Sequence, residues 1–171
     1  MPINFLQIST SKIETLSIGA AINPKLAMIN HSCDSNYGRI WNLEQNTVKA
    51  FSTRPIRKGE EITDGYSGVF QNVPQDERTA IHSRYHFDCL CQACGQQWPM
   101  KDELPINLPK KDRNVAKLKK ILDVAQKTDG QVEKYQILKQ GVTLAYQILK
   151  PPHAIICDLE SDFYKQLRLM N

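Results

Sequence analysis

Three cysteines crowd into six residues of this 171-residue chain, at Cys89, Cys91 and Cys94. The C-x-C-x2-C spacing lets one loop present three sulfurs to one ion, and zinc keeps such soft ligands deprotonated at neutral pH. A redox role is disfavoured because the pair Cys91 and Cys94 does not lie in a βαβ pattern. The cluster therefore predicts a structural zinc site, which does not by itself define an activity.

A closed structural zinc site has four ligands, so one ligand must come from another part of the chain. The candidates are Cys33, Cys157 and the histidines, of which His82 and His86 are nearest to the cluster. Cys157 lies in an apolar segment, where a free cysteine acts as a small hydrophobe. Cys33 lies in a polar, turn-like segment, and this setting favours it as the fourth ligand.

The composition is that of an ordinary globular chain, with 41% hydrophobic and 23% charged residues. The net charge of +4 is spread along the chain, which disfavours nucleic-acid binding. No apolar run approaches the ~20 residues of a membrane span, and the first residues show no secretory signal. We therefore expect a cytoplasmic or nuclear location in a reducing compartment, with no membrane partner.

The chain changes character near residue 100. Before that point, β-branched residues and turn formers are frequent up to about residue 75. Four short segments are predicted to be extended, namely 3–8, 13–22, 46–52 and 61–63. Helix is not excluded for the first two of them. In the segment 46–52, alternation places Val48, Ala50 and Ser52 on one face.

Helical patterns dominate the rest of the chain. One helix is predicted over 75–86, where Pro74 is suited to the start. Its predicted shared side carries Ala80, Ile81 and Arg84. The prolines between Trp98 and Pro109 mark a linker. Beyond it, two apolar stripes at helical spacing surround a break at 128–130, and a third helix is predicted over 154–169. We interpret the stripes as core packing of a helical-repeat-like unit.

Three motifs, in this order along the chain, resemble the second half of a SET domain with its post-SET cysteines. They are Asn30-His31-Ser32-Cys33 followed by Asn36, then Gly59-Glu60-Glu61-Ile62 with Tyr66, then Tyr85 through Cys94. The order and spacing are similar to the SET- and MYND-domain (SMYD) lysine methyltransferases, and residues 91–99 are most similar to their member-4-like branch. The resemblance covers about residues 5–100.

The resemblance implies an α+β fold in three parts. Residues 1–75 would form the C-terminal part of a β-rich SET domain, and residues 76–100 a post-SET zinc-binding segment. Residues 101–171 would form a linker and an α-helical, TPR-like region that could bind protein partners. The implied function is S-adenosylmethionine-dependent N-methylation of a lysine in a histone or another protein. The alternative is a catalytically inactive, zinc-stabilised protein-interaction module.

The resemblance also implies roles for single residues. Asn30 and His31 would hold S-adenosylmethionine, and Phe87 would stack on its adenine. Tyr66 would line the methyl-transfer site, with Tyr85 near the lysine channel. Methyl transfer is an in-line displacement that needs placement of the amine and exclusion of water, without a catalytic metal.

The family offers an account of the zinc site as well. Cys33 would join Cys89, Cys91 and Cys94 on one structural zinc ion, which would fasten the segment of Phe87 against the Asn-His motif. Two family features are not found in the sequence, the Gly-x-Gly cofactor motif and the MYND finger. We therefore expect the chain to be the C-terminal part of a longer protein, as a fragment, a short isoform or an incomplete gene model, and to bind cofactor weakly or not at all on its own.

Overall fold

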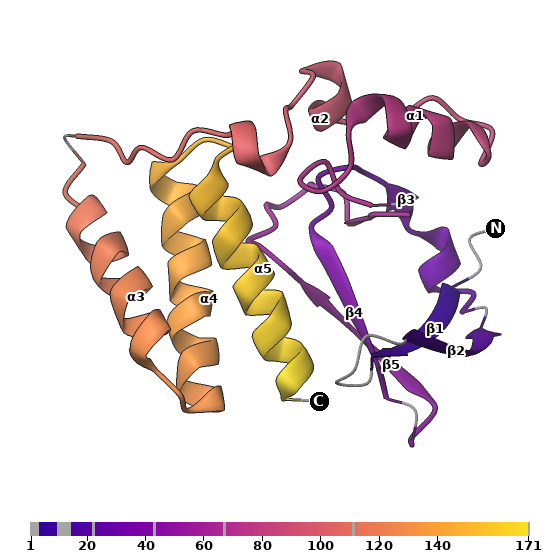
Figure 1. The fold of residues 1–171 in the computed structure, drawn as a ribbon, viewed down its shortest axis with the longest axis horizontal. Helices are drawn as coiled ribbons and strands as arrows, with labels where there is room; N and C mark the ends of the chain where they lie inside the picture. The colour runs from indigo at the N-terminus through magenta and orange to yellow at the C-terminus, as the bar shows by residue number, and fades with distance from the viewer. Residues whose placement is uncertain are drawn as a thin grey trace.

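The computed structural model describes residues 4–9, 15–21, 23–42, 44–66, 68–110 and 112–170, with side chains from residue 23 onward. Strands lie on one side of the molecule and three long helices stand in a row on the other (Figure 1). The small β-rich part followed by a helical region confirms the predicted α+β class. Within the described ranges, no helix is both long and apolar enough to cross a membrane.

The strands form three two-stranded sheets, and four of the strands overlap the segments predicted to be extended, whereas the strands at 30–31 and 37–42 were not predicted. The antiparallel pairs are β1 (Asn4–Ser9) with β2 (Thr15–Ala21) and β4 (Tyr37–Asn42) with β5 (Thr47–Ser52). The parallel pair is β3 (Asn30–His31) with β6 (Thr63–Asp64). This parallel pair joins two distant motifs of the sequence, because the chain reaches Tyr66 two residues after β6 ends.

In β5 the half-buried residues do not all lie on the face that the alternation indicated, because Val48 lies on that face and Phe51 on the opposite one. Ala50 and Ser52 are exposed, whereas Val48 and Phe51 are half-buried. The Phe51 ring lies 5.7 Å from the ring of Tyr164, which comes from the last helix of the chain. Packing between distant segments therefore decides which face of this strand is covered.

Two short helices precede the helical region, α1 (Gln75–Ser83) and α2 (Gln92–Gly95). The helix α1 begins directly after Pro74, as predicted, and of the three residues predicted to share a side only Ile81 is half-buried. Ala80 and Arg84 are exposed, and the buried residues of α1 are Arg78 and His82. The packed side of this helix is thus polar.

The three long helices are α3 (Val115–Lys127), α4 (Gln131–Ile148) and α5 (Ala154–Leu169). They lie side by side in the order α3, α4, α5 (Figure 1), and α4 packs against both neighbours. Their apolar stripes form one core, which includes Leu118, Leu138, Val142, Leu159 and Phe163. The stripes are core packing, as the sequence predicted.

A second core joins the helical region to the cysteine loop. It is built from Cys33, Phe70, Ala93, Trp98, Leu104, Ala154 and Cys157. Trp98 and Leu104 fall in the predicted linker, yet both are buried at 5% exposure. The backbone of α5 is attached there too, since the Ala154 N–H donates to the Pro105 carbonyl over 3.1 Å. Residues 98–109 are therefore partly core.

Gly38 allows α5 to approach the hairpin of β4 and β5. A Cβ atom there would lie 2.8 Å from Phe51 and 3.1 Å from Tyr164, and the Tyr164 hydroxyl donates to the Arg39 carbonyl. A contact of 2.8 Å is shorter than real Cβ atoms show. The rings of Phe51 and Tyr164 pack against each other, so they cannot easily move away from an added methyl group. We expect Gly38→Ala to lower the free energy of unfolding by about 1–3 kcal/mol, measured by urea denaturation.

The matched control for this prediction is Gly95→Ala at the end of α2. No atom lies within 4 Å of a Cβ built at Gly95, so this variant is expected to unfold at the wild-type urea midpoint. Equal destabilisation by Gly38→Ala and Gly95→Ala would show that backbone effects, and not the crowding by Phe51 and Tyr164, set the result.

Candidate zinc and cofactor site

Four cysteines from two distant segments meet at one point. The sulfurs of Cys33, Cys89, Cys91 and Cys94 all lie within 4.8 Å of one another. Cys33 Sγ is 3.5 Å from Cys94 Sγ and 4.0 Å from Cys89 Sγ. In a tetrahedron with Zn–S bonds of about 2.3 Å, sulfurs are about 3.8 Å apart. The donor set fits zinc in both chemistry and spacing, and Cys157 is not part of it.

The thiols of this group differ in their pKa values. The hydrogen bond from the Cys33 thiol lowers the pKa of Cys91 to about 3, whereas the Cys91 partner and burial raise the pKa of Cys33. Burial also raises the pKa of Cys89 to about 11. Cys91 is therefore the thiolate of this group relative to Cys33 and Cys89, and a divalent cation would favour deprotonation of those two.

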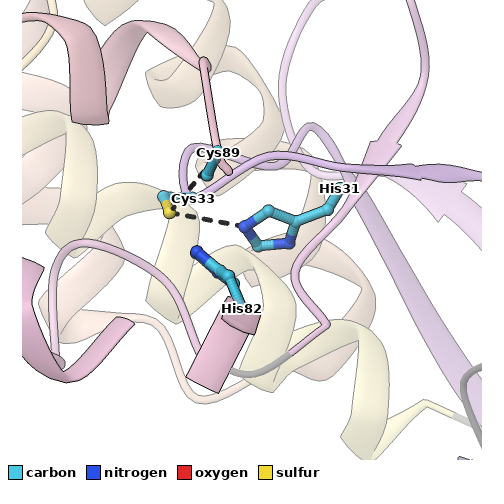
Figure 2. A group of neighbouring side chains, drawn as sticks. All are labelled: His31, Cys33, His82 and Cys89. Atoms are coloured by element: carbon cyan, nitrogen blue, oxygen red, sulfur yellow. Dashed lines mark hydrogen bonds between the residues drawn. The ribbon is translucent and has the colours of Figure 1, made fainter. Parts of the chain in front are cut away.

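A second group shares two of these cysteines. Figure 2 shows His31, Cys33, His82 and Cys89, whose potential ligand atoms also lie within 4.8 Å of one another. His31 Nε2 lies 3.4 Å from Cys33 Sγ. Both ring nitrogens of His82 are buried and have no hydrogen-bond partner among the described residues. Burial and then the neighbouring His82 lower the pKa of His31 to about 4, so its imidazole is neutral at pH 7.

The aromatic residues of the predicted site form one cluster beside the sulfurs. The ring of Tyr66 lies 5.7 Å from that of Tyr85 and 6.3 Å from that of Phe87. The ring of His31 lies 5.2 Å from Tyr66 and 5.7 Å from Phe87. On the other side of the cluster, His82 stacks on Phe87 at 5.3 Å. Segments far apart in the sequence thus contribute to one aromatic wall.

Tyr66 is held at both of its polar ends. Its hydroxyl donates to the Ile29 carbonyl over 2.6 Å, and its backbone N–H donates to His31 Nδ1 over 3.1 Å. Burial, followed by the charges of Asp64 and Tyr85, raises the pKa of Tyr66. The phenol therefore stays protonated at neutral pH and acts as a hydrogen-bond donor.

A cleft of about 680 Å³ opens next to this cluster. Its lining includes all three residues predicted to hold the cofactor, Asn30, His31 and Phe87, together with Tyr66. Tyr85 is not among the residues that line the cleft, although its ring lies close to that of Tyr66. The volume is within the range of about 300–1,000 Å³ that is typical of small-molecule sites.

One residue that the sequence analysis left without a role connects the motifs. Asn36 is 1% exposed and donates to the Glu61 carbonyl and the Glu60 carboxylate, while its own oxygen accepts from the Thr63 N–H. Glu60 also pairs with Arg54. Glu60 is thus a structural partner in this structure. The signal for Asn36 was its place three residues after Cys33, beside the polar motif.

The comparisons with known proteins match the part of the chain that carries this site. Residues 5–67 match the family model described as SET domain. Over 78 residues the chain is 35% identical to a SET and MYND domain-containing protein of Dictyostelium discoideum, covering 46% of this chain and 19% of that protein. Over 172 residues it is 26% identical to the human histone-lysine N-methyltransferase SMYD1, covering 91% of this chain and 34% of that protein.

A further relative bears on the branch. The human protein-lysine N-methyltransferase SMYD4 is 27% identical over 145 residues, which cover 78% of this chain and 18% of that protein. The matches thus span about a third or less of the relatives' own lengths. Residues 5–67 are thus similar to a SET domain, and the chain is related to the SMYD methyltransferases without a distinction between a member-4-like branch and the others.

Proposed function

We propose that this chain acts in S-adenosylmethionine-dependent N-methylation of protein lysines by a SET-type mechanism. The observation that carries the proposal is the meeting of Asn30, His31, Phe87 and Tyr66 around one cleft. The cofactor would supply a methyl group on a sulfonium. The chain's contribution would be to bind it, to orient the incoming amine and to exclude water.

In this proposal each residue has a role that suits its chemistry. Phe87 presents an aromatic face to the cleft. Asn30 presents a side-chain amide, which donates to the Glu61 carboxylate over 2.6 Å in this structure. Tyr66 and Tyr85 would flank the lysine, with the Tyr66 hydroxyl fixed by the Ile29 carbonyl. Aromatic walls suit the passage of an alkyl chain with a cationic or neutral amine at its end.

The proposed role of zinc is structural. An ion on Cys33, Cys89, Cys91 and Cys94 would fasten the segment of Phe87 to the Asn-His motif without entering the reaction. We further propose the division into a SET part (1–75), a post-SET segment (76–100) and a linker with TPR-like helices (101–171). The member-4-like branch, a histone or other protein substrate, protein partners for the helices, and a nuclear or cytoplasmic location belong to the same proposal.

The test measures cofactor binding and methyl transfer with three substitutions. We expect Phe87→Ala to weaken binding of S-adenosylmethionine in calorimetry, because the stacking face is removed. We expect Tyr66→Phe and Asn30→Ala to lower transfer of labelled methyl groups to histones or lysate proteins at least about 10-fold, a size typical of lost site interactions. The matched control is Tyr135→Phe in α4, far from the cleft, which should label as wild type.

A second candidate function, the zinc-stabilised interaction module without catalysis, has its own supporting observation. Leu90 lies between two zinc ligands and is 91% exposed, and Met28 is 81% exposed. Exposed apolar side chains of this kind suit a protein contact. The calorimetry separates the two candidates, because an interaction module has no reason to bind S-adenosylmethionine at micromolar concentration. Loss of that binding on Phe87→Ala would favour the methyltransferase.

A further inference from the structure

Both ring nitrogens of His31 have partners within the protein. Its Nε2 lies 3.4 Å from Cys33 Sγ, and its Nδ1 accepts the Tyr66 backbone N–H over 3.1 Å. Figure 2 shows the ring directed edge-on at the sulfur. The ring is also held between its neighbours, with centroids 4.3 Å from His82 and 5.7 Å from Phe87. One side chain therefore links the cysteine group to the backbone of Tyr66.

The position of the ring proton follows from these partners. A backbone N–H can only donate, so the bond from Tyr66 requires Nδ1 without a proton. A neutral imidazole then carries its proton on Nε2, which donates to the sulfur. The Asp64 carbonyl also faces His31 and would favour a proton on the facing nitrogen. That carbonyl accepts from the Ser32 N–H over 3.0 Å and has a second lone pair, so the bond from Tyr66 is the observation that assigns the ring proton.

This arrangement distinguishes the two candidate ligand groups. In the group of Figure 2, a protonated Nε2 of His31 has no lone pair to offer a metal ion. The group would then have only Cys33, Cys89 and His82. The four-cysteine group has four free sulfur donors. A single ion thus belongs to the cysteines, and His31 serves one of them as a hydrogen-bond donor.

We propose that His31 is a positioning residue that couples metal binding at Cys33 to the backbone of Tyr66. A metal-bound thiolate carries negative charge, and it accepts a stronger hydrogen bond than a thiol does. His31 passes this restraint to the Tyr66 N–H, while the Tyr66 hydroxyl is held by Ile29. The metal would thereby restrain Tyr66 through the side chain of His31. The consequence of this coupling for methyl transfer rests on the proposed function, whereas the coupling between the metal and Tyr66 does not.

Two substitutions separate the two hydrogen bonds. His31→Asn places an amide oxygen near the position of Nδ1, where it can still accept from Tyr66, but leaves no donor that reaches Cys33. His31→Gln places an amide nitrogen near the position of Nε2, where it can donate to Cys33, but removes the acceptor for Tyr66. The control is His153→Asn, because His153 is also buried and its Nδ1 accepts a backbone N–H, from Ile155.

The experiment is nuclear magnetic resonance on the whole chain loaded with zinc or with a spin-active cadmium isotope. In the wild type we expect a nitrogen spectrum with the proton on Nε2, and a scalar coupling from cadmium to that proton across the N–H···S bond. We expect the Tyr66 amide resonance to move when cadmium replaces zinc. The proposal would be overturned by a proton on Nδ1, or by a Tyr66 amide resonance that does not move when cadmium replaces zinc.

The variants give the decisive pattern. His31→Asn should shift the cadmium resonance, make the Tyr66 amide insensitive to the metal, and weaken zinc binding about 10-fold, as lost partners of metal ligands do. His31→Gln should keep the cadmium resonance near that of the wild type and shift the Tyr66 amide. The control His153→Asn should change neither signal. Equal metal sensitivity of Tyr66 in the wild type and His31→Asn would contradict the coupling.

These signals do not depend on methyl transfer. If they follow the expected pattern and no methyl transfer is found, the coupling stands and the proposed function fails. If transfer is found and the signals do not follow the pattern, His31 has no positioning role and the proposed function stands.

Discussion

Cys33→Ser is expected to release zinc as completely as Cys91→Ser, although the two residues lie far apart in the sequence. Both sulfurs belong to the group that fits a tetrahedral ion. Loss of a residue that only hydrogen-bonds to a metal ligand weakens metal binding by up to about 100-fold. Loss of one of the four ligands themselves should therefore weaken zinc binding by more than this. The measurement is zinc per chain by mass spectrometry after dialysis against a chelator.

Cys157→Ser is the matched control for this prediction. Cys157 is 2% exposed and lies in the second core, and burial raises its pKa to about 12, so it stays a protonated thiol. The variant should therefore retain one zinc per chain. Zinc content that depended on Cys157 and survived Cys33→Ser would refute the ligand set.

Zinc loss should also be visible in the packing around the cysteine loop. Trp98 is buried, and its ring lies 5.0 Å from that of Phe70, in the same core as Cys33. Once the ion no longer holds the loop, water should reach the indole. A red shift of the Trp98 emission in Cys33→Ser, measured against a Trp41→Phe background, would report this opening.

Much of the site was predictable because its chemistry is local in the sequence. The three crowded cysteines indicated a metal, and the polar setting of Cys33 indicated the fourth ligand; the structure brings the four together. The aromatic cluster of Tyr66, Tyr85 and Phe87 was predicted only by resemblance. Their roles in catalysis and cofactor binding stay predictions.

The polar side of α1 could not be predicted by hydropathy. Arg78 and His82 are almost fully buried, whereas a hydropathy pattern places charged and polar residues on the solvent-exposed side of a helix. Arg78 donates to the Val73 carbonyl, and His82 packs between His31 and Phe87. His31 and Phe87 lie in other segments, so only the fold explains why the polar side of α1 is covered.

The same reasoning applies where helices meet strands. The face of β5 is decided by Tyr164 of α5, and the burial of Trp98 by a core that also contains Ala154. A helical period fixes which residues of one helix share a stripe, but does not say what covers a distant strand. The apolar stripes of α3 to α5 were predictable because their partners are the neighbouring helices.

Glu160→Gln is expected to stabilise the chain at pH 8 relative to the wild type, and to have a much smaller effect near pH 4.5. Glu160 lies on α5 at 9% exposure, accepts from the Tyr146 hydroxyl over 2.7 Å, and faces Asp34 and Arg54 from the β-rich part. Burial first, and the charge of Asp34, raise its pKa from 4.5 to about 7.

The sign follows from proton binding in the two states. Between pH 4.5 and 7 the folded chain binds more protons at Glu160 than the unfolded chain does, so the free energy of unfolding falls as the pH rises through this window. The accumulated difference is about 3 kcal/mol, at 1.36 kcal/mol per pKa unit. Glutamine keeps an acceptor for Tyr146 and has no charge to desolvate, so this loss disappears.

The measurement is urea unfolding of the zinc-loaded wild type and Glu160→Gln at several pH values from 5 to 8. The cysteines titrate in both proteins, so the difference between the two reports on the carboxyl group at Glu160 together with its charge interaction with Asp34, whose pKa burial raises to about 6. The control is Glu133→Gln on the exposed side of α4, whose difference from the wild type should not change across the window. A constant difference for Glu160→Gln would mean that water or Arg54 keeps this carboxylate charged in the folded protein, and that the contact between α5 and the β-rich part is not sensitive to pH.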